Sequence, residues 1–480
     1  MEKVLTVSNL KTQFFIYEGV VKAIDDVSFT LRKGEVLGIV GETGCGKSVT
    51  AYSITRLIPD PPGRIISGKI MLGNLNLLKN LDKEAKIIQK KRIKIVRNRK
   101  IIRKNDYFLN RIRGKYISMI FQEPMAALNP VYTVEDQIVE TLFLHNLTKM
   151  LKIIKSSSKH LSELVKFRDQ KEISYFFDDD VGEELKKIVS ANKGQESILK
   201  HLDMLIESSK LYLKKEAKYE KMLIKSIEND KIEEKLLSNI SQEEEDQIIK
   251  ILTKESKKIN LIKISKKLKR NTRDPLIIEA RREALFLLES VNIPNAYRVL
   301  KSYPHELSGG MLQRVVISIS LSNNPYVLIA DEPTTALDVT VQAQILEILK
   351  NLQKNNKTSI ILITHDLGVI AEMSDRVAVM YAGNIVESAS TDDIFHNPKH
   401  PYTIGLLQSI PRIDNPDKKL KTVPGSVPNL INPPSGCRFN PRCPLAFDKC
   451  KLEKPPTIEV SDGHTVACHL FSGKEVYNDE

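Results

Sequence analysis

The stretch that most constrains this chain is a short loop with the pattern G-x-x-x-x-G-K-[ST]. It consists of Gly41, Glu42, Thr43, Gly44, Cys45, Gly46, Lys47 and Ser48. An apolar run of strand type, 36–40, precedes the loop, and a helix is expected to begin at Ser48. Glycines let backbone N–H groups turn onto phosphate oxygens, and the helix N-terminus adds a positive dipole end. The loop therefore predicts a nucleotide site in which Lys47 reaches the β- and γ-phosphates and Ser48 binds Mg²⁺.

A second feature is a pair of carboxylates at the end of an apolar strand. The run 327–330 is followed directly by Asp331 and Glu332, and Pro333 then ends the strand. A carboxylate at such a strand end can hold Mg²⁺ through water, and the next carboxylate can polarise the attacking water. We therefore expect Asp331 to hold the Mg²⁺ ion and Glu332 to polarise the attacking water.

Two further apolar strands end in polar side chains that suit the same chemistry. The strand 117–121 ends on Gln122, whose amide oxygen can ligate the metal and orient water. The strand 359–364 ends on His365, which can donate a hydrogen bond to the γ-phosphate. A lone histidine there could also be an ordinary satisfied polar residue, but its place after a buried strand favours a functional role. The predicted catalytic residues are Glu332, His365 and Gln122, and the predicted Mg²⁺ ligands are Ser48, Gln122 and Asp331.

Two other stretches are candidates for nucleotide contact. Ser308, Gly309 and Gly310 precede an apolar helix, so their backbone predicts a second phosphate site. Residues 4–31 alternate apolar and polar side chains around a glycine, as in a β-hairpin. Aromatic residues in this hairpin could stack on adenine, with Tyr17 the first candidate and Phe15 the second, and packing within the hairpin is the alternative.

Length and composition limit the class of protein. A chain of 480 residues with 41% hydrophobic residues can form two or three domains. It contains no run of about 18 uninterrupted apolar residues, and its first residues lack the apolar segment of a signal peptide. These features predict a cytoplasmic protein.

The positive charge is concentrated in one stretch. The formal net charge is +13, and residues 83–115 hold 14 Lys and Arg against Glu84 and Asp106, a net of +12. A solvated loop is the simpler interpretation, and contact with anionic lipid headgroups or nucleic acid is the alternative. We favour the solvated loop because the stretch has little aromatic content for stacking bases.

Residues 130–275 have a different composition from the rest of the chain. No proline lies between Pro130 and Pro275, and the glycines there are Gly182 and Gly194. Lys, Glu, Ile and Leu dominate with helical spacing in places, but heptads are not sustained. The region predicts a charged helical module rather than a long coiled coil, and its composition also fits partial disorder.

Taken in order, these motifs resemble the nucleotide-binding subunit of an ABC ATPase. The resemblance covers roughly residues 4–145 and 275–470, and it departs from the general family at Met311, where glutamine is more frequent. Further stretches look like the D-type ATP-binding subunit of the oligopeptide/dipeptide permeases. These are 121–125 with 128–130, 303–307, 400–407, 424–428, 436–439 and 441–444.

The resemblance implies an α/β fold with four parts. It predicts a P-loop NTPase core with an antiparallel β subdomain, a helical subdomain that carries a large helical insertion, and a small cysteine-containing extension. The predicted boundaries are 1–145 for the first part of the nucleotide-binding domain, with a basic insertion near 80–112; 146–274 for the helical insertion; 275–395 for the second part; and 396–480 for the extension.

The resemblance also implies a mechanism and partners. Two such subunits would enclose two ATP molecules head to tail, with 41–48 of one facing 308–310 of the other, and Asp338 of the 336–338 stretch belongs to this nucleotide site. Closure would drive two membrane permease subunits. The implied partners are also a second, different ATP-binding subunit and an extracytoplasmic peptide-binding protein, with no nucleic acid. The implied location is the cytoplasmic face of the membrane, as a peripheral protein with ATP and Mg²⁺ as cofactors.

Four of the five cysteines cluster near the C-terminus. Their spacing is Cys437-x5-Cys443-x6-Cys450-x17-Cys468, which lacks the close pairs of a zinc ribbon. Four thiolates on irregular loops suit a [4Fe–4S] cluster, and relatives in the permease subfamily carry one in a similar stretch. We rank the cluster ahead of Zn²⁺, and Zn²⁺ ahead of four reduced structural thiols, with a structural rather than an electron-transfer role.

A rival class is a soluble ABC ATPase of the SMC-like repair type that acts on nucleic acid. Such proteins also place long helices between the glutamine and the Ser-Gly-Gly motif. Against this class, the helical module is short and lacks sustained heptads, and the C-terminal stretch is similar to the permease type.

Overall fold

The computed structural model describes most of the chain as two compact units. The described residues are 2–89, 93–170, 179–190, 195–235, 244, 247–248, 274–335, 337–409 and 423–472. The first unit comprises 1–103, 326–335 and 342–480, and the second comprises 104–325 and 336–341. The first unit is formed by segments that are far apart in the sequence, because residues 104–325 of the second unit lie between them.

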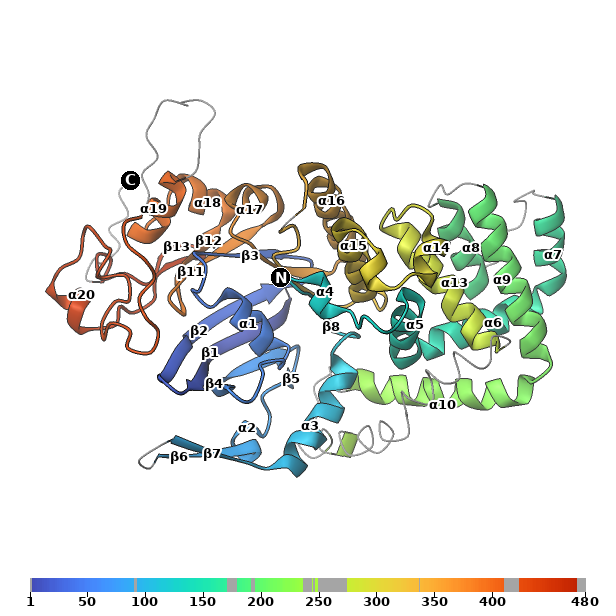
Figure 1. Ribbon diagram of the computed structural model, residues 1–480, viewed down its shortest axis with the longest axis horizontal. Coiled ribbons are helices and arrows are strands. Elements are labelled where there is room, and N and C mark those ends of the chain that lie inside the picture. The colour runs from blue at the N-terminus through green and yellow to red at the C-terminus, as the bar shows by residue number, and fades with distance from the viewer. Residues whose placement is uncertain are drawn as a thin grey trace. The chain divides into compact units, whose positions relative to one another are not determined.

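The first unit contains an antiparallel sheet built on two long strands (Figure 1). Its order is β2-β1-β4-β5, with bounds Gly19–Arg32, Lys3–Ile16, Gly63–Leu72 and Leu75–Asn76. Thr6 lies opposite Thr30 on one side and Met71 on the other. Buried Leu5 and Val7 alternate with partly exposed neighbours, so one face of the sheet packs inward, as the sequence alternation predicts.

A second sheet of the first unit contains the strands that position the site. The strands of this unit follow the order β13-β14-β12-β11-β3-β10-β9. Strand β10 pairs in parallel with both β3 and β9, and β11 pairs in parallel with the other side of β3. Every residue of the three central strands is buried, which explains their continuous apolar runs. The bounds are β3 Val36–Val40, β9 Val327–Asp331, β10 Ser359–Ile363, β11 Arg376–Tyr381, β12 Asn384–Ser390, β13 Ile458–Ser461 and β14 His464–Val466.

Short helices complete the first unit. Local signals fix their starts: Asp366 accepts hydrogen bonds from Gly368 and Val369, and Ser390 accepts one from Asp393. The helices are α1 Lys47–Ile54, α2 Leu81–Glu84, α17 Leu367–Met373, α18 Thr391–His396, α19 Pro401–Gln408 and α20 Asp448–Leu452. Helix α16, Val339–Asn356, begins in the 336–341 segment of the second unit and continues in the first.

The second unit is mainly helical, and the charged module contributes to its core. Helix α9 packs against α13 and α6, and Leu202 and Leu205 of α9 join buried apolar residues of the neighbouring helices. The elements are β8 Ile117–Ile120, α4 Pro124–Ala127, α5 Val134–His145, α6 Leu147–Lys159, α7 Leu161–Gln170, α8 Asp180–Ser190, α9 Gln195–Leu213, α10 Glu216–Lys235, α13 Pro275–Ser290, α14 Ala296–Lys301, η1 Pro304–Glu306 and α15 Gly309–Leu321.

A buried charge cluster joins the module to the helix that follows it in sequence. Arg282 of α13 is fully buried, and its guanidinium contacts Glu279 at 2.7 Å and Glu184 of α8 at 3.2 Å. A buried cation of this kind requires its carboxylate partners, since an unpaired charge in the interior is very costly. The helical character predicted for 146–274 is present in its described parts, whereas 171–178, 191–194 and most of 236–273 lie outside the described residues.

The basic stretch does not form the solvated loop that we favoured from its composition. Its described residues form a two-stranded hairpin, β6 Ala85–Gln89 with β7 Ile93–Arg97, and helix α3, Arg99–Ile112. Phe108 and Leu109 of α3 are buried, so apolar side chains between the cations give this helix a buried face. None of the described helices is long and apolar enough to cross a bilayer.

Candidate functional site

The phosphate loop connects β3 to α1 in a conformation that requires glycine. Gly41 and Gly46 have φ values of +151° and +102°. A Cβ atom on Gly41 would lie 2.1 Å from the Met380 carbonyl oxygen, and one on Gly46 would lie 2.6 Å from that of Ala23. Positive φ and close backbone neighbours both exclude a side chain at these positions. The pattern read from the sequence thus corresponds to a tight loop that packs on β2 and β11.

Lys47 is held with its ammonium against the backbone of the loop. Its side chain is buried, and Nζ donates to the carbonyl oxygens of Gly41 at 2.7 Å and Glu42 at 3.2 Å. Both partners are neutral carbonyls, and Lys47 interacts electrostatically with the carboxylates of Asp331 and Glu332 without an ion pair to either among the described residues. The ammonium is therefore available to anionic phosphate oxygens that enter the loop.

Parallel pairing of the central strands brings Ser48 next to Asp331. Ser48 Oγ donates to Asp331 Oδ1 at 3.0 Å, although the two residues are 283 positions apart. Asp331 Oδ2 accepts no hydrogen bond from the described residues, and the side chain is buried. Burial raises the pKa of Asp331 to about 6, with a smaller contribution from neighbouring Glu332. A hydroxyl and an unsatisfied carboxylate oxygen are hard oxygen donors that suit Mg²⁺.

Glu332 is fixed in an unusual backbone conformation beyond the end of β9. Its φ is +47°, and its N–H donates to the Ile363 carbonyl oxygen of β10 at 2.8 Å. Oε2 accepts from Thr335 Oγ1 at 2.9 Å, and Oε1 lies 3.3 Å from His365 Nδ1. Burial raises the pKa of Glu332, but the hydrogen bonds from Thr335 and His365 outweigh it and lower the pKa. The carboxylate is therefore ionised at neutral pH, as a base requires.

Thr335 was not among the residues predicted from the sequence. It lies three positions after Glu332, in the Pro-Thr-Thr turn that follows the strand. A hydroxyl residue shortly after a carboxylate is a common turn signal, and this was the available clue. His365 is exposed and contacts Oε1 of Glu332, whereas Thr335 contacts Oε2, so each carboxylate oxygen has a partner.

Several predicted nucleotide contacts belong to the second unit. Ser308 begins α15, and its Oγ accepts the N–H of Met311 at 3.4 Å. Gly309 and Gly310 form the first turn of that helix, and Asp338 Oδ1 accepts the N–H of Val341 at 2.9 Å. Gln122 is exposed after β8. The roles of these residues toward a nucleotide stay predictions.

The aromatic candidates occupy the N-terminal hairpin. Tyr17 lies between β1 and β2 and is 93% exposed, so its ring is not used in packing. Phe15 is partly buried and lies opposite Val20 in the β1–β2 ladder. Hairpin packing therefore accounts for Phe15 but not for Tyr17, and the adenine-stacking role of Tyr17 stays a prediction.

The four C-terminal cysteines are free thiols that influence one another electrostatically. Burial raises the pKa of Cys437 to about 11, and the other three thiols add to this rise. The N–H of Cys437 donates to the Cys450 carbonyl oxygen at 2.8 Å. Nevertheless, no group of three or more His, Cys, Asp or Glu side chains in the described part of the chain has metal-site geometry. The iron–sulfur prediction thus has no support from ligand geometry.

Comparison with known proteins links the chain to transport ATPases. The family described as ABC transporter matches residues 24–335, and the family described as oligopeptide/dipeptide transporter, C-terminal region, matches residues 386–450. The oligopeptide transport ATP-binding protein AppD of Bacillus subtilis (strain 168) is 36% identical over 98% of both chains. The dipeptide transport ATP-binding protein DppD of the same strain is 36% identical over 98% of this chain and 95% of its own length.

The raised pKa of Asp331 predicts a pH-dependent gain in stability for Asp331→Asn. The folded carboxyl keeps its proton up to a pH of about 6, whereas the unfolded one loses it near 3.8, so the wild type loses stability as pH rises through this window. Asparagine can still accept the Ser48 hydrogen bond. In Mg²⁺-free buffer we expect the variant to be more stable by about 2–3 kcal/mol at pH 8, and equally stable near pH 3.5.

Urea unfolding at a series of pH values measures this difference. Asp375→Asn, at another carboxylate of the same unit that accepts a hydrogen bond from Val36, is the control. A stability difference between Asp331→Asn and wild type that does not change between pH 4 and 7 would contradict the assignment.

Proposed function

The chain belongs to the family of ABC transporter ATP-binding subunits that serve oligopeptide and dipeptide transport, and on this premise we propose how its residues energise a peptide importer. The protein is an ATPase of this class, which hydrolyses ATP to ADP and phosphate. The observation that carries the proposal is the convergence of Ser48 and Asp331 beside the glycine-dependent loop, with Glu332 and His365 on the adjoining strand ends. Relatives that match along 98% of this chain are peptide transport proteins, so the nucleic-acid alternative of the SMC-like type is set aside.

We assign the steps of hydrolysis to residues at the carboxyl ends of β3, β9 and β10. Backbone N–H groups of 41–48 and the Lys47 ammonium bind the phosphates. When bound, Mg²⁺ would be held by Ser48 and Asp331, with Gln122 as a further ligand, and it would neutralise phosphate charge. Glu332 takes a proton from the attacking water, and His365 donates to the γ-phosphate.

We also propose that a second ATP-binding subunit completes the site. Its Ser308, Gly309, Gly310 and Asp338 equivalents would face the nucleotide bound by 41–48, and those of this chain would face the partner's nucleotide. Closure around ATP and opening after hydrolysis would move two membrane permease subunits that receive peptide from an extracytoplasmic binding protein. The chain would then work as a peripheral protein on the cytoplasmic face of the membrane.

For the four cysteines we propose a [4Fe–4S] cluster, with Zn²⁺ as the alternative. The supporting observation is proximity: Cys443, Cys450 and Cys468 all lie close enough to Cys437 to raise the pKa of its thiol. A bound metal would favour the thiolate form over the protonated one. A bound cluster would cross-link Cys450 of α20 with three loop positions of the extension, which is a structural role.

Glu332→Gln separates ATP binding from hydrolysis. Glutamine keeps the hydrogen-bonding shape but cannot accept the proton, so we expect ATP turnover to fall by about 10²–10⁴-fold while ATP binding is retained. Phosphate release and nucleotide binding, both measured on the purified importer complex, test this. Glu347→Gln, an exposed glutamate on α16, is the control. Turnover near the wild-type rate would remove Glu332 from its assigned role.

Cys443→Ser tests the identity of the metal group. Because a serine hydroxyl is a poor ligand for iron or zinc, we expect the variant to lose iron and visible absorbance that the wild type carries after anaerobic purification. Cys45→Ser, outside the set of four, should retain both. Zinc without iron in the wild type would identify a Zn²⁺ site instead. If neither metal is found, the four cysteines are structural thiols.

A further inference from the structure

One loop of the C-terminal extension directs two arginines toward the phosphate loop. Arg438 and Arg442 lie between Cys437 and Cys443, and they are 8% and 9% exposed. Phe439 lies between them in sequence and packs on the rings of Tyr381 and Tyr402 at centroid distances of 5.1 and 5.4 Å. Two nearly buried guanidinium groups on one short loop need a structural or functional reason, because burial of a charge is costly.

Arg442 forms a bidentate ion pair with Glu42, the second residue of the phosphate loop. Nη1 lies 2.7 Å from Glu42 Oε2, and Nη2 lies 2.9 Å from Oε1. The remaining donors of the guanidinium are also engaged, with Nε 2.7 Å from the Pro424 carbonyl oxygen and Nη2 3.2 Å from that of Val423. Arg442 is therefore held in place by contacts other than the one to Glu42, and the fork geometry fixes the orientation of that carboxylate.

The backbone of Glu42 is held by the same part of the chain. Its N–H donates to the Tyr402 hydroxyl at 2.9 Å. Tyr402 lies on α19, is fully buried, and packs against Tyr381 with a centroid distance of 4.6 Å. Both the main chain and the side chain of Glu42 thus have partners outside the nucleotide-binding core.

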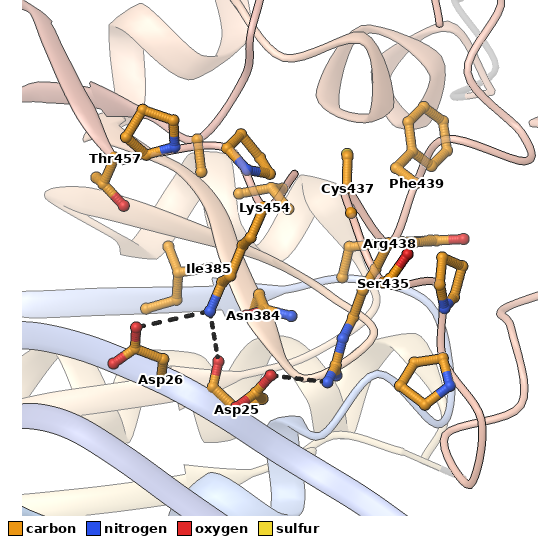
Figure 2. A pocket seen from close by; sticks show the side chains of 18 of the residues that line it. Asp25, Asp26, Asn384, Ile385, Ser435, Cys437, Arg438, Phe439, Lys454 and Thr457 are labelled. Carbon is orange, nitrogen blue, oxygen red and sulfur yellow. Dashed lines mark hydrogen bonds and ion pairs between the residues drawn. The ribbon is translucent and has the colours of Figure 1, made fainter. Parts of the chain in front are cut away.

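Arg438 supports the other end of the phosphate loop through the turn between β11 and β12. It donates to the Ala382 carbonyl oxygen of this turn, and its Nη2 lies 2.9 Å from Asp25 Oδ2 on β2. The next residue, Gly383, donates to the Cys45 carbonyl oxygen at 2.8 Å. Figure 2 shows these side chains in the lining of a pocket, where Arg438 pairs with Asp25 and Lys454 pairs with Asp26.

These contacts matter for ATP because Glu42 places a negative charge in a loop that binds anionic phosphates. An unpaired carboxylate there would repel the nucleotide and would be free to move the loop backbone. We propose that loop 437–443 positions the phosphate loop for ATP, with Arg442 neutralising and orienting Glu42 and Arg438 holding the turn that supports Cys45. Both arginines are positioning residues, and this inference rests on the proposed ATP-binding function.

Nucleotide binding to three variants tests the inference. The purified full-length protein is titrated with Mg²⁺ and a non-hydrolysable ATP analogue by calorimetry. Arg442→Gln should weaken binding about tenfold, because it leaves Glu42 unpaired. Adding Glu42→Gln to Arg442→Gln should restore binding to within about threefold of the wild type, because the repelling charge is gone. Lys449→Gln, an exposed cation on the same extension, should bind like the wild type.

The outcomes separate this inference from the proposed function. A wild type that binds no analogue would overturn the proposed function itself. Unchanged affinity in Arg442→Gln, or a loss that Glu42→Gln does not restore, would overturn the positioning role and leave the proposed function intact. If Arg442→Gln does not fold, Arg442→Lys keeps the charge but loses the fork; an affinity equal to that of wild type in this variant would also contradict the orienting role of Arg442.

Discussion

The parallel pairing of β10 with β3 on one side and β9 on the other is the constraint on which the site depends. Because parallel strands present their carboxyl ends at the same edge, the phosphate loop, Asp331 and His365 must meet there. The hydrogen bond from Ser48 to Asp331 and the bond from the Glu332 N–H to Ile363 are direct consequences. Nucleotide chemistry in this chain therefore follows from the order of three fully buried central strands.

The sequence could select the side chains that the structure brings together, whereas it could not give their connections. Asp331 and His365 lie at the ends of short apolar runs, which mark polar strand ends, and Lys47 is marked by the glycine pattern of its loop. The strand order and the left-handed backbone of Glu332 depend on tertiary contacts that no local pattern encodes, whereas its hydrogen bond to Thr335 is a local turn contact. The basic stretch was wrongly predicted as a loop for a different reason. The prediction used its net charge and did not consider the apolar residues that lie in β6 and β7 and on the buried face of α3.

The C-terminal extension is an integral part of the nucleotide-binding unit. Buried Glu387 of β12 accepts hydrogen bonds from the Lys399 N–H at 2.6 Å, the His400 N–H at 2.9 Å and His464 Nε2 at 2.8 Å. This carboxylate ties β14 to the start of α19, which carries Tyr402 to the phosphate loop. The region shared with oligopeptide and dipeptide transporters thus contacts the same loop that is shared with ABC ATPases in general.

The central claim, that this subunit energises a peptide importer, is tested most directly by its partners in the cell. The tagged protein would be purified from its own cells in mild detergent, and the co-purifying proteins would be identified by mass spectrometry. We expect two polytopic membrane proteins and a second ATP-binding subunit to co-purify with it. Recovery of nucleases, DNA or ribosomes without membrane subunits would contradict the claim.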